Sequence, residues 1–515
     1  MKKIIVLLLA LIMVVSAFAA CGPTDPKPTK PSSSSSSSGG GGVTPPVDED
    51  EILNVDIDSV DYGGDTVTVF YWSPLECKEF EVSETDIIGN DINDAVYRKN
   101  LYTEQALGIE FNFISGGELW GYNEIPAYLQ DLAALEEDTP VDVISGSIRM
   151  LPSAMIEGYL KDMTEFHEDL DFEKAWWPGE VVDCFSIKDR LYFVSGDIST
   201  NLLCDMLTIF VNKTILESRG TTYATLMQNV LAGSWTLDDM YELCAGMHID
   251  KTNDGPSVDD KFGFVTNWYC SDALYNGAGF EYMKSSNADD EVFKISPDML
   301  GLAVDEYVTY MTDWATTGDF YCGPKGDVIY TENFYNGNSI FALMYAVNGI
   351  ILQSTDIDFA VVPPPKLNSA QKKYYTSIGT QYCTYGIGTS SENWDRAAQT
   401  IQCLGYYAYQ FTTPAIFEVT FKGKFAKDQY SIDTFDLMRN SLVYDPGKAY
   451  DTFICGSKDW QYYLPNIVSW TISGGNEWST DKVWGSEFNA TKQETVRKLI
   501  KAANEKIIAF LEIDS

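Results

Sequence analysis

Residues 65–147 alternate between the periodicities of a strand and a helix. The stretch "DTVTVFYW" places Val67, Val69 and Tyr71 on one face, which is the two-residue repeat of a strand. A helical spacing follows in "INDAVYRKNLYTEQALG", where Gly108 is the expected helix end. The order repeats as the strand "IEFNFIS", the helix "EIPAYLQDLAALEED" and the buried strand "VDVISGS". A β-α-β-α-β order predicts a parallel sheet with right-handed crossovers.

Similar patterns continue along the rest of the chain. "MLPSAMIEGYLKDM" has helical spacing, whereas "DRLYFVSGD", "MLTIFVNK", "KFGFVTN" and "SIFALMYA" are strand-like. "TLDDMYELCAGM" begins with Thr236 and has Asp239 three residues later, which is a capping-box pattern for a helix start. A chain of 515 residues is too long for one compact core, so two or more lobes are expected.

The charge of the chain is the unusual part of its composition. Hydrophobic residues make up 45% and charged residues 21%, as in ordinary globular proteins. The chain has 35 Lys and Arg against 75 Asp and Glu, a net charge of −40. Nucleic-acid binding needs a basic face, so this charge argues against a nucleic-acid role. It disfavours anionic ligands without a local cationic site and is compatible with neutral ligands such as sugars.

The N-terminus has the pattern of a secretory signal. In residues 1–20, Lys2 and Lys3 precede the apolar run Ile4–Val15, and small residues follow. The alternative is an uncleaved membrane anchor, but the apolar run is shorter than the roughly 20 residues that a spanning helix needs. "FAAC" resembles the lipobox of bacterial lipoproteins, which implies cleavage before Cys21 and lipid on its thiol. Several acyl chains would then anchor the protein firmly.

Residues 21–52 have the composition of a disordered linker. The segment consists mainly of Pro, Ser, Gly, Thr and Asp, which bury too little apolar surface to offset the entropy of ordering. About 30 such residues have a root-mean-square reach of about 30 Å. We therefore expect a spacer between a lipid anchor and a folded body.

The cysteines give no metal-binding pattern. With Cys21 assigned to lipid, nine of the ten cysteines remain, and no CxxC pair occurs among them. Zinc spacing is therefore absent, and small buried side chains are the expected role. Disulfides are compatible with a location outside the membrane, but the spacing does not pair them.

Several segments occur in the order of a known family. They are "VDVISGSIRMLPSAMIEGYLKDMTEF", "DRLYFVSGDIST", "LTIFVNKTILESRG", "GSWTLDDMYELC", "NFYNGNSIFALMYA", "IDFAVVPPPKL" and "IGTQYCTYGIGTSSENWDRAAQTIQCL". Together they resemble the family 1 extracellular solute-binding proteins, the sugar-binding lipoproteins of bacterial ABC importers. Asn212 and Lys213 match the family pattern, whereas Asp189 and Arg190 replace its usual Gly-Lys. The matches cover about 140–410.

This resemblance implies an α/β, two-lobed periplasmic-binding-protein-like fold of type II. Each lobe would be a mostly parallel sheet flanked by helices, with a ligand cleft between the lobes. The first lobe would be residues 65–203 plus 377–430, and the second 204–376 plus 431–515. The implied protein is a monomer without enzymatic activity on the outer face of the bacterial cell membrane. It would deliver a carbohydrate, with an oligosaccharide favoured, to an ABC permease.

The proposed cleft residues follow from where strands end. In open α/β sheets, ligands bind outside the carboxyl ends of the strands. Aromatic planes suit the CH faces of a sugar, and short polar groups suit its hydroxyls. The candidate ligand-binding residues are Trp72, Ser73, Ser145, Ser147, Asp197, Trp268, Tyr269, Asn348 and Tyr382. Tyr382 lies in a loop near the place where the chain is expected to return from the second lobe to the first. The competing interpretation places the aromatic residues in the core or on the surface and makes Asp197 a helix cap.

No cofactor is expected. The loop "DKTNDGPSVDDK" half-matches a calcium loop, with Asp250, Asp254 and Gly255 at the first, fifth and sixth positions. Lys261 stands where a calcium loop has its bidentate Glu, so a solvated turn is favoured over Ca²⁺ binding.

Two other function classes remain open. His167 and His248 are the histidines of the chain, and neither belongs to an HExxH motif. GxSxG and P-loop motifs are also absent from the sequence. A glycoside hydrolase needs two carboxylates, which 75 acidic residues cannot exclude. A surface glycan-binding lipoprotein without a transporter is the other alternative.

Overall fold

A computed structural model describes residues 60–83, 85–117, 124–134, 139–251, 253, 255–286, 290–324, 327–456, 462–473 and 490–513. The signal at 1–20, Cys21 and the linker at 21–52 lie outside the described residues. Residues Leu53–Ser515 belong to one compact unit. Within the described part, no helix combines the length and apolar character needed to cross a membrane.

The first sheet has the strand order β12-β3-β1-β2. β1 is parallel to both of its neighbours, and β12 is antiparallel to β3. The strands are β1 (Asp65–Tyr71), β2 (Ile109–Ser115), β3 (Val143–Ser147) and β12 (Cys383–Ile387). Helix α3 (Asp91–Leu107) joins β1 to β2, and α4 (Glu124–Ala133) lies between β2 and β3. The β-α-β-α-β order expected from the periodicity is confirmed.

Local sequence signals explain where α3 begins and ends. The Asn90 side chain accepts hydrogen bonds from the backbone N–H groups of Ile92 and Asn93, which caps the helix start. Gly108 follows in the left-handed conformation with φ 62°, which glycine adopts without steric cost. The preceding strand β1 supplies fully buried core residues, with Val67, Val69 and Phe70 at 0% exposure.

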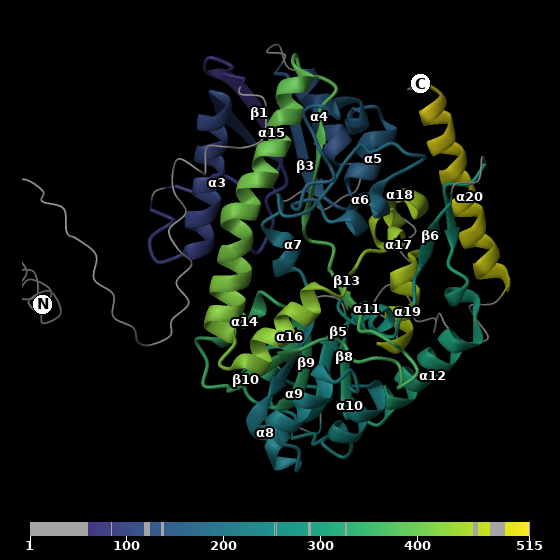
Figure 1. The fold of residues 1–515 in the computed structure, drawn as a ribbon. Coiled ribbons are helices and arrows are strands. Elements are labelled where there is room, and N and C mark those ends of the chain that lie inside the picture. The colour runs from purple at the N-terminus through teal and green to yellow at the C-terminus, as the bar shows by residue number, and fades with distance from the viewer. Residues whose placement is uncertain are drawn as a thin grey trace, which may run out of the picture. The chain divides into compact units, whose positions relative to one another are not determined.

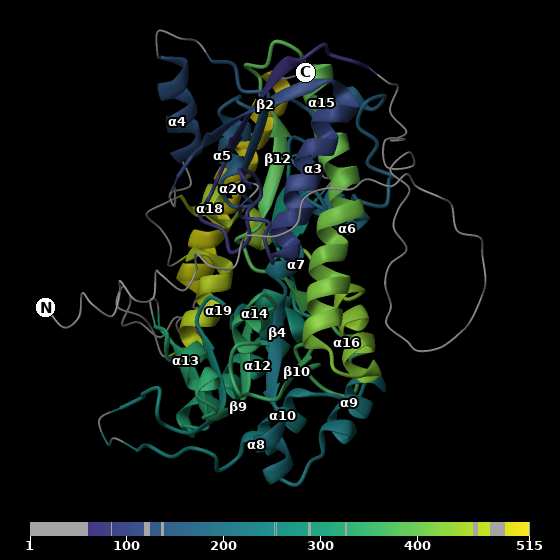
Figure 2. The ribbon, with the colours of Figure 1, turned by 90° about the vertical axis from the view of Figure 1, so that its left-hand side faces the viewer.

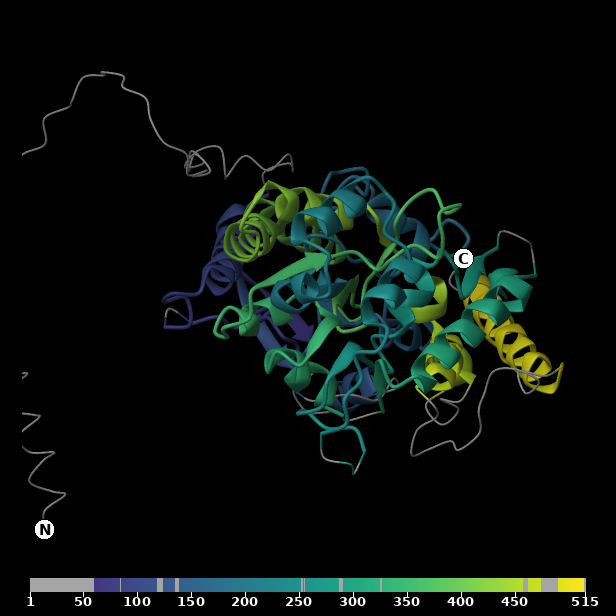
Figure 3. The ribbon, with the colours of Figure 1, turned by 90° about the horizontal axis from the view of Figure 1, so that it is seen from below.

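The second sheet has the strand order β10-β4-β9-β5-β8. β5 is parallel to β8 and β9, whereas β4 is antiparallel to β9 and β10. The strands are β4 (Leu207–Asn212), β5 (Phe262–Asn267), β8 (Phe320–Gly323), β9 (Ser339–Tyr345) and β10 (Phe359–Val362). Figure 1 and Figure 2 show the two sheets at opposite ends of the body, and Figure 3 views it from the end that carries the second sheet.

Among the described residues, three chain segments connect the two sheets. The first passes through α7 (Asn201–Cys204) into β4, and the second returns through β11 (Thr376–Ser377) to β12. The third is a continuous helical run of α15 (Trp394–Tyr407) and the π-helical segments η3 (Ala408–Thr412) and η4 (Ala415–Phe425).

This helical run spans both halves (Figure 1). It packs on α3 beside the first sheet, and its last residue, Phe425, contacts Phe359 of the second sheet at 6.1 Å between ring centroids.

The C-terminal region adds helices beside both sheets. Helix α20 (Ala490–Ile513) lies on the flank opposite α15 (Figure 1, Figure 3). Its apolar face buries Val496, Ile500 and Ile507. Strand β13 (Leu442–Val443) pairs in parallel with β11, and α16 (Gln429–Arg439), α17 (Pro446–Ala449), α18 (Asp451–Cys455) and α19 (Leu464–Ile472) complete this region.

The remaining elements surround the two sheets. They are α5 (Leu151–Ile156), η1 (Met163–Phe166), α6 (Gly179–Phe185), α8 (Lys213–Ser218), α9 (Tyr223–Leu231), α10 (Leu237–Cys244), α11 (Asp272–Gly277), β6 (Met283–Ser285), β7 (Phe293–Ile295), η2 (Asp298–Leu300), α12 (Leu302–Thr316), α13 (Ile329–Tyr335) and α14 (Asn348–Leu352). The capping box expected at Thr236 and Asp239 is present at the start of α10.

The prediction of a strand for "DRLYFVSGD" is wrong. Apart from an isolated bridge between Val194 and Tyr385, the segment pairs with no strand among the described residues. It is preceded by a turn in which Lys188 and Asp189 have φ values of 51° and 64°. It ends at Gly196, with φ 158°, where a Cβ atom would collide with the carbonyl oxygen of Trp176. The backbone therefore turns at both ends, and its apolar residues fill the core without extending a sheet.

Candidate ligand-binding cavity

A cavity of about 350 Å³ lies between the two sheets. From the side of the first sheet it is lined by Trp72, Ser147, Arg149 and Met150. From the side of the second sheet it is lined by Trp268, Tyr269, Asp272 and Tyr345. The remaining wall comes from the return crossing and the C-terminal helices, namely Gly379, Thr380, Gln381, Lys448, Pro465, Asn466 and Ser469.

The first-lobe wall, formed by residues at and after the ends of β1 and β3, combines the polar side chains of Ser147 and Arg149 with Trp72 and Met150. Ser147 ends β3, and its hydroxyl donates to the carbonyl oxygen of Thr380 at 2.8 Å. Arg149 Nη2 donates to Asp451 Oδ2 at 2.8 Å, and the Asp451 side chain is 1% exposed. Burial raises the pKa of Asp451 to about 6, and the guanidinium opposes this rise. Trp72 is 1% exposed, so it forms the cavity floor rather than an open ring face.

The second-lobe wall, formed by the residues after β5 and β9, is aromatic. The rings of Tyr269 and Tyr345 stack with centroids 6.2 Å apart and an interplanar angle of 22°. Trp268 meets Tyr269 edge-on at 5.7 Å. The hydroxyls of Tyr269 and Tyr330 are hydrogen-bonded at 2.8 Å. Tyr269 is 37% exposed, which leaves much of this ring accessible to a ligand.

A buried ion pair joins α17 to α11 at the cavity. Lys448 Nζ donates to Asp272 Oδ2 at 2.8 Å, and both side chains are 6% exposed. The same ammonium donates to Ser377 Oγ at 2.9 Å and to the Ile378 carbonyl oxygen at 2.6 Å. All three ammonium donors are therefore used. Burial raises the pKa of Asp272, and Lys448 opposes the rise.

Asp205 holds the return crossing, which is the connecting segment that runs through β11 to β12. The backbone N–H of Gln381 donates to Asp205 Oδ2 at 2.7 Å, and that of Gly379 to the Asp205 carbonyl oxygen at 2.9 Å. A Cβ at Gly379 would lie 2.7 Å from Asp205 Oδ2 and closer still to the Tyr345 ring, so this close approach requires glycine. Burial raises the pKa of Asp205 to about 7.

These contacts determine what the cavity can accept. Arg149 and Lys448 are each paired with a buried carboxylate, which balances the cationic charge at the wall. The other lining groups are aromatic rings, a thioether, amides and hydroxyls. Such a wall suits an uncharged molecule with apolar faces and a polar rim.

The structure brings four of the nine sequence-predicted residues to the cavity wall. They are Trp72, Ser147, Trp268 and Tyr269. Ser145 points to the same side of β3 as Ser147 but lies two residues deeper, where it is fully buried. Ser73 Oγ donates to the Gly117 carbonyl oxygen at 3.2 Å, outside the lining residues.

The other three predicted residues make contacts elsewhere. Asp197 accepts from Thr413 Oγ1 at 2.9 Å, and burial raises its pKa to about 6. Asn348 Nδ2 donates to the Tyr335 hydroxyl at 2.9 Å at the start of α14. Tyr382 is 2% exposed and lines a smaller neighbouring cavity of about 10 Å³.

Sequence reasoning missed lining residues of two kinds. Arg149, Met150 and Tyr345 lie at or shortly after strand ends, where a wider search of each loop would have reached them. Lys448 and Asn466 come from α17 and α19, which follow no strand of either large sheet. No local signal marks those helices as cavity walls.

The loop with the half-matched calcium pattern is hydrogen-bonded internally. Asp250 Oδ1 accepts from the backbone N–H of Asn253 at 2.6 Å. The Asp260 carboxylate accepts from the N–H groups of Lys251 and Ser257, each at 2.8 Å. Asp254 lies outside the described residues. In the described ranges, no group of three or more His, Cys, Asp or Glu side chains could hold a metal ion.

Comparisons with known proteins identify the fold. No protein-family model matches the chain, and no curated protein matches it. Among solved structures, the sugar-binding protein MalE from Xanthomonas citri is 14% identical with a TM-score of 0.53, covering 86% of this chain and 97% of that one. The ABC transporter associated binding protein from B. animalis subsp. lactis, in complex with β-1,6-galactobiose, is 14% identical with a TM-score of 0.52, covering 86% and 98%.

A third similar structure is the galacto-N-biose and lacto-N-biose I-binding protein of an ABC transporter from Bifidobacterium longum. It is 12% identical with a TM-score of 0.51, covering 88% of this chain and 98% of that one. This chain has the fold of the ABC-transporter sugar-binding proteins. The predicted two-lobed, periplasmic-binding-protein-like α/β fold is thereby confirmed. The three structures reported above are binding proteins rather than enzymes.

Proposed function

We propose that this chain is a family 1 extracellular solute-binding protein that captures a carbohydrate between its two lobes. The main support for this proposal is the cavity between the sheets, which has aromatic rings on one wall and hydrogen-bonding groups on the other. A short oligosaccharide suits a cavity of about 350 Å³, which is within the usual range for ligand pockets. Its CH faces would lie on Tyr269, and its hydroxyls would meet Gln381 and Asn466.

Binding would be coupled to lobe closure. A ligand can favour a closed conformation only through contacts that differ between the open and closed states. A sugar that touches Tyr269 in the second lobe and the loop beside Arg149 in the first meets this condition, because opening would break one set of contacts. Hinged closure of two lobes around a ligand is an established type of transition.

The proposed partner is an ABC permease in the bacterial cell membrane, and this chain would be lipid-anchored at the outer face of that membrane. The support is the signal pattern at 1–20, the lipobox-like sequence ending at Cys21, and the linker composition of 21–52. A lipid on Cys21 would keep the binding body near the permease, and a reach of about 30 Å would leave the body free to turn.

A binding role is favoured over glycoside hydrolysis. Hydrolysis needs two carboxyl groups facing the substrate, about 5 to 9.5 Å apart. Of the described residues that line the cavity, Asp272 is the carboxylate, and it is ion-paired with Lys448. A second acid positioned against a bound sugar is absent from this lining set.

A thermal-shift screen over mono- and oligosaccharides tests the proposal. A sugar at 100 times its dissociation constant should stabilise the protein by about 2.7 kcal/mol. The bound sugar should make the body more compact in solution scattering and should remain intact by chromatography. Hydrolysis of the sugar would favour the enzyme, and tight binding without uptake through a permease would favour a surface glycan-binding lipoprotein. Absence of both binding and compaction across the panel would contradict the proposed function.

A further inference from the structure

Two cysteines from distant parts of the sequence lie in contact. Cys77 Sγ and Cys204 Sγ are 3.4 Å apart, and both residues are buried as free thiols. Cys77 lies in the loop that follows β1 and begins with Trp72, whereas Cys204 ends α7, at the first crossing between the sheets. A disulfide requires about 2.05 Å between sulfurs, so the contact lies just over 1 Å beyond bonding distance.

Hydrogen bonds hold the two backbones at this spacing. The N–H of Cys77 donates to Asn201 Oδ1 at 2.9 Å, and Asn201 Nδ2 donates to the Cys77 carbonyl oxygen at 2.8 Å. Asn201 begins α7, three residues before Cys204, and residues three apart lie on the same helix face. One side chain therefore fixes Cys77 on the face of α7 that presents the second sulfur.

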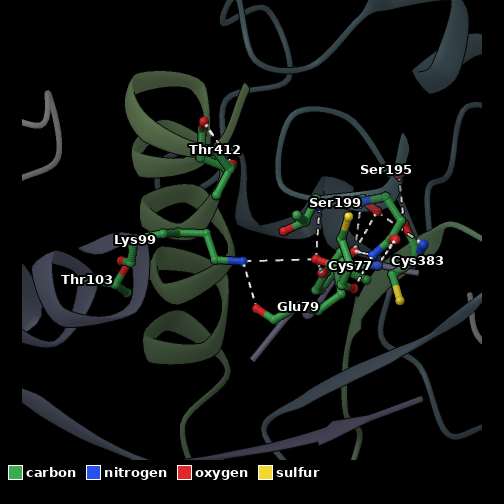
Figure 4. A network of polar contacts seen from close by, with 12 residues as sticks. Cys77, Glu79, Lys99, Thr103, Ser195, Ser199, Cys383 and Thr412 are labelled. Carbon is green, nitrogen blue, oxygen red and sulfur yellow. Dashed lines mark hydrogen bonds and ion pairs between the residues drawn. The ribbon is translucent and has the colours of Figure 1, made fainter. Parts of the chain in front are cut away.

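A buried carboxylate fixes the same two segments a second time (Figure 4). Glu79 accepts from Ser199 Oγ at 3.0 Å, from the backbone N–H of Thr200 at 2.9 Å and from the Tyr385 hydroxyl at 3.0 Å. Lys99 Nζ lies 4.0 Å from its carboxylate and donates to its backbone carbonyl oxygen at 3.1 Å. The sulfur contact is thus imposed by a polar network that does not involve sulfur.

We propose that Cys77 and Cys204 form a disulfide bond in the mature protein. The proposal rests on the proposed extracellular location, because disulfides persist in oxidising compartments. An external disulfide compound is the oxidant. One cysteine thiolate attacks it and expels a thiol, and the second thiolate then attacks the mixed disulfide and expels the other. The protein loses two protons and two electrons, and the oxidant gains them as two thiols.

The cross-link joins the loop carrying Trp72 to the start of the first crossing. It encloses β2 and β3, so it should stabilise the first lobe by restricting the unfolded chain. Because Glu79 also binds Tyr385 of β12, both cysteines are fixed to the first sheet. The bond should therefore affect stability more than closure. Each of the other seven described cysteines, such as Cys184 and Cys403, stays a thiol.

Peptide mapping of the full chain tests the proposal. The protein is unfolded, reduced, refolded with oxidised glutathione, alkylated and digested without reductant. We expect the Cys77 and Cys204 peptides as one species, lighter than their sum by two hydrogen atoms. Both peptides alkylated, modified by glutathione or joined to other cysteines would overturn the proposal. This arm does not depend on cellular location, and sugar binding is measured separately, so failure of the proposed function is distinguishable.

Matched variants give a second measurement. Reductant should lower the melting temperature of the wild type by about 5 °C, and the variant C77A/C204A should show no such dependence. Cys403→Ala, which removes a buried thiol elsewhere, should keep the wild-type response. A wild-type melting temperature insensitive to reductant would contradict the cross-link. If the double variant does not fold, the wild-type peptide map decides.

Discussion

The two walls of the cavity are held in place by different physical forces. On the second-lobe wall, Tyr269, Tyr345 and Trp268 fix one another through ring contacts between 5.7 and 6.2 Å. On the first-lobe wall, Arg149 is fixed by an ion pair with Asp451, a residue 302 positions away along the chain. One wall is therefore organised mainly by aromatic packing, and the other by a polar contact between residues far apart in the sequence.

This difference separates affinity from stability. Removing an exposed aromatic side chain leaves no uncompensated charge, so its loss should mainly weaken binding. Removing one member of a buried ion pair leaves an uncompensated charge, so its loss should mainly weaken the fold. Variants on the two walls should therefore fail in different assays.

The largest effect is expected for Arg149→Met on the first-lobe wall. Asp451 would be left without its guanidinium partner in a site where its side chain is 1% exposed. We expect the free energy of unfolding to fall by about 3 kcal/mol, measured by urea denaturation. The matched control is Arg149→Met combined with Asp451→Asn, which removes the stranded charge and should recover much of the loss. A single variant as stable as the wild type would show that the ion pair does not organise this wall.

The next effect is expected for Tyr269→Ala on the second-lobe wall. Loss of an accessible ring against the ligand should raise the dissociation constant for the sugar found in the screen about 30-fold, or about 2 kcal/mol. Tyr409→Ala is the matched control, because Tyr409 is 38% exposed against 37% for Tyr269 and lies in η3, away from the cavity. If calorimetry gives the two variants equal affinity, Tyr269 does not contact the bound sugar.

The same contrast explains what the sequence could predict. Strand β1, helix α3 and the capping box at Thr236 follow from local periodicity and capping, and all three are present. Trp268 and Tyr269 could be predicted because β5 has a clear pattern and ligands gather at strand ends. Local signals were therefore sufficient for Trp268 and Tyr269 of the aromatic wall, whereas Tyr345 was missed.

Long-range contacts explain what the sequence could not predict. Arg149 and Asp451 carry no pattern that pairs them across 302 positions. Lys448 reaches the cavity only because α17 folds back beside the return crossing at Ser377 and Ile378. Ser145 and Ser147 share a strand face, and only the depth of the cavity separates their roles.

A smaller effect is expected in the pH dependence of the Arg149→Met variant. In the wild type, burial raises the pKa of Asp451 in the folded state to about 6, above its ordinary value of 3.8. The contribution of Asp451 to stability is therefore full below about pH 4 and is lost as pH rises through 6. Without the guanidinium this pKa rises further, which extends the loss to higher pH.

When pH falls from about 7.5 to about 5, the difference in the free energy of unfolding between the variant and the wild type should therefore become smaller. It should shrink by about 1 kcal/mol for each unit by which the pKa of Asp451 is higher in the variant. Urea denaturation at both pH values measures this difference. The free energy of unfolding of Tyr269→Ala should instead change with pH in the same way as that of the wild type, because this substitution removes no partner of a buried carboxylate. If the difference in unfolding free energy between Arg149→Met and the wild type is the same at both pH values, the variant does not leave an unpaired charge on Asp451.

The smallest effect is expected for Tyr269→Phe, which keeps the ring and removes the hydroxyl bonded to Tyr330 at 2.8 Å. Loss of one hydrogen bond between neutral groups should cost about 1 kcal/mol of stability or less. Affinity should stay within about threefold of the wild type, since the ring face remains. Tyr409→Phe serves as the matched control, and calorimetry with the same sugar measures both. A loss of affinity as large as that of Tyr269→Ala would show that the hydroxyl, rather than the ring face, contacts the sugar, and the second-lobe wall would then be polar in function like the first.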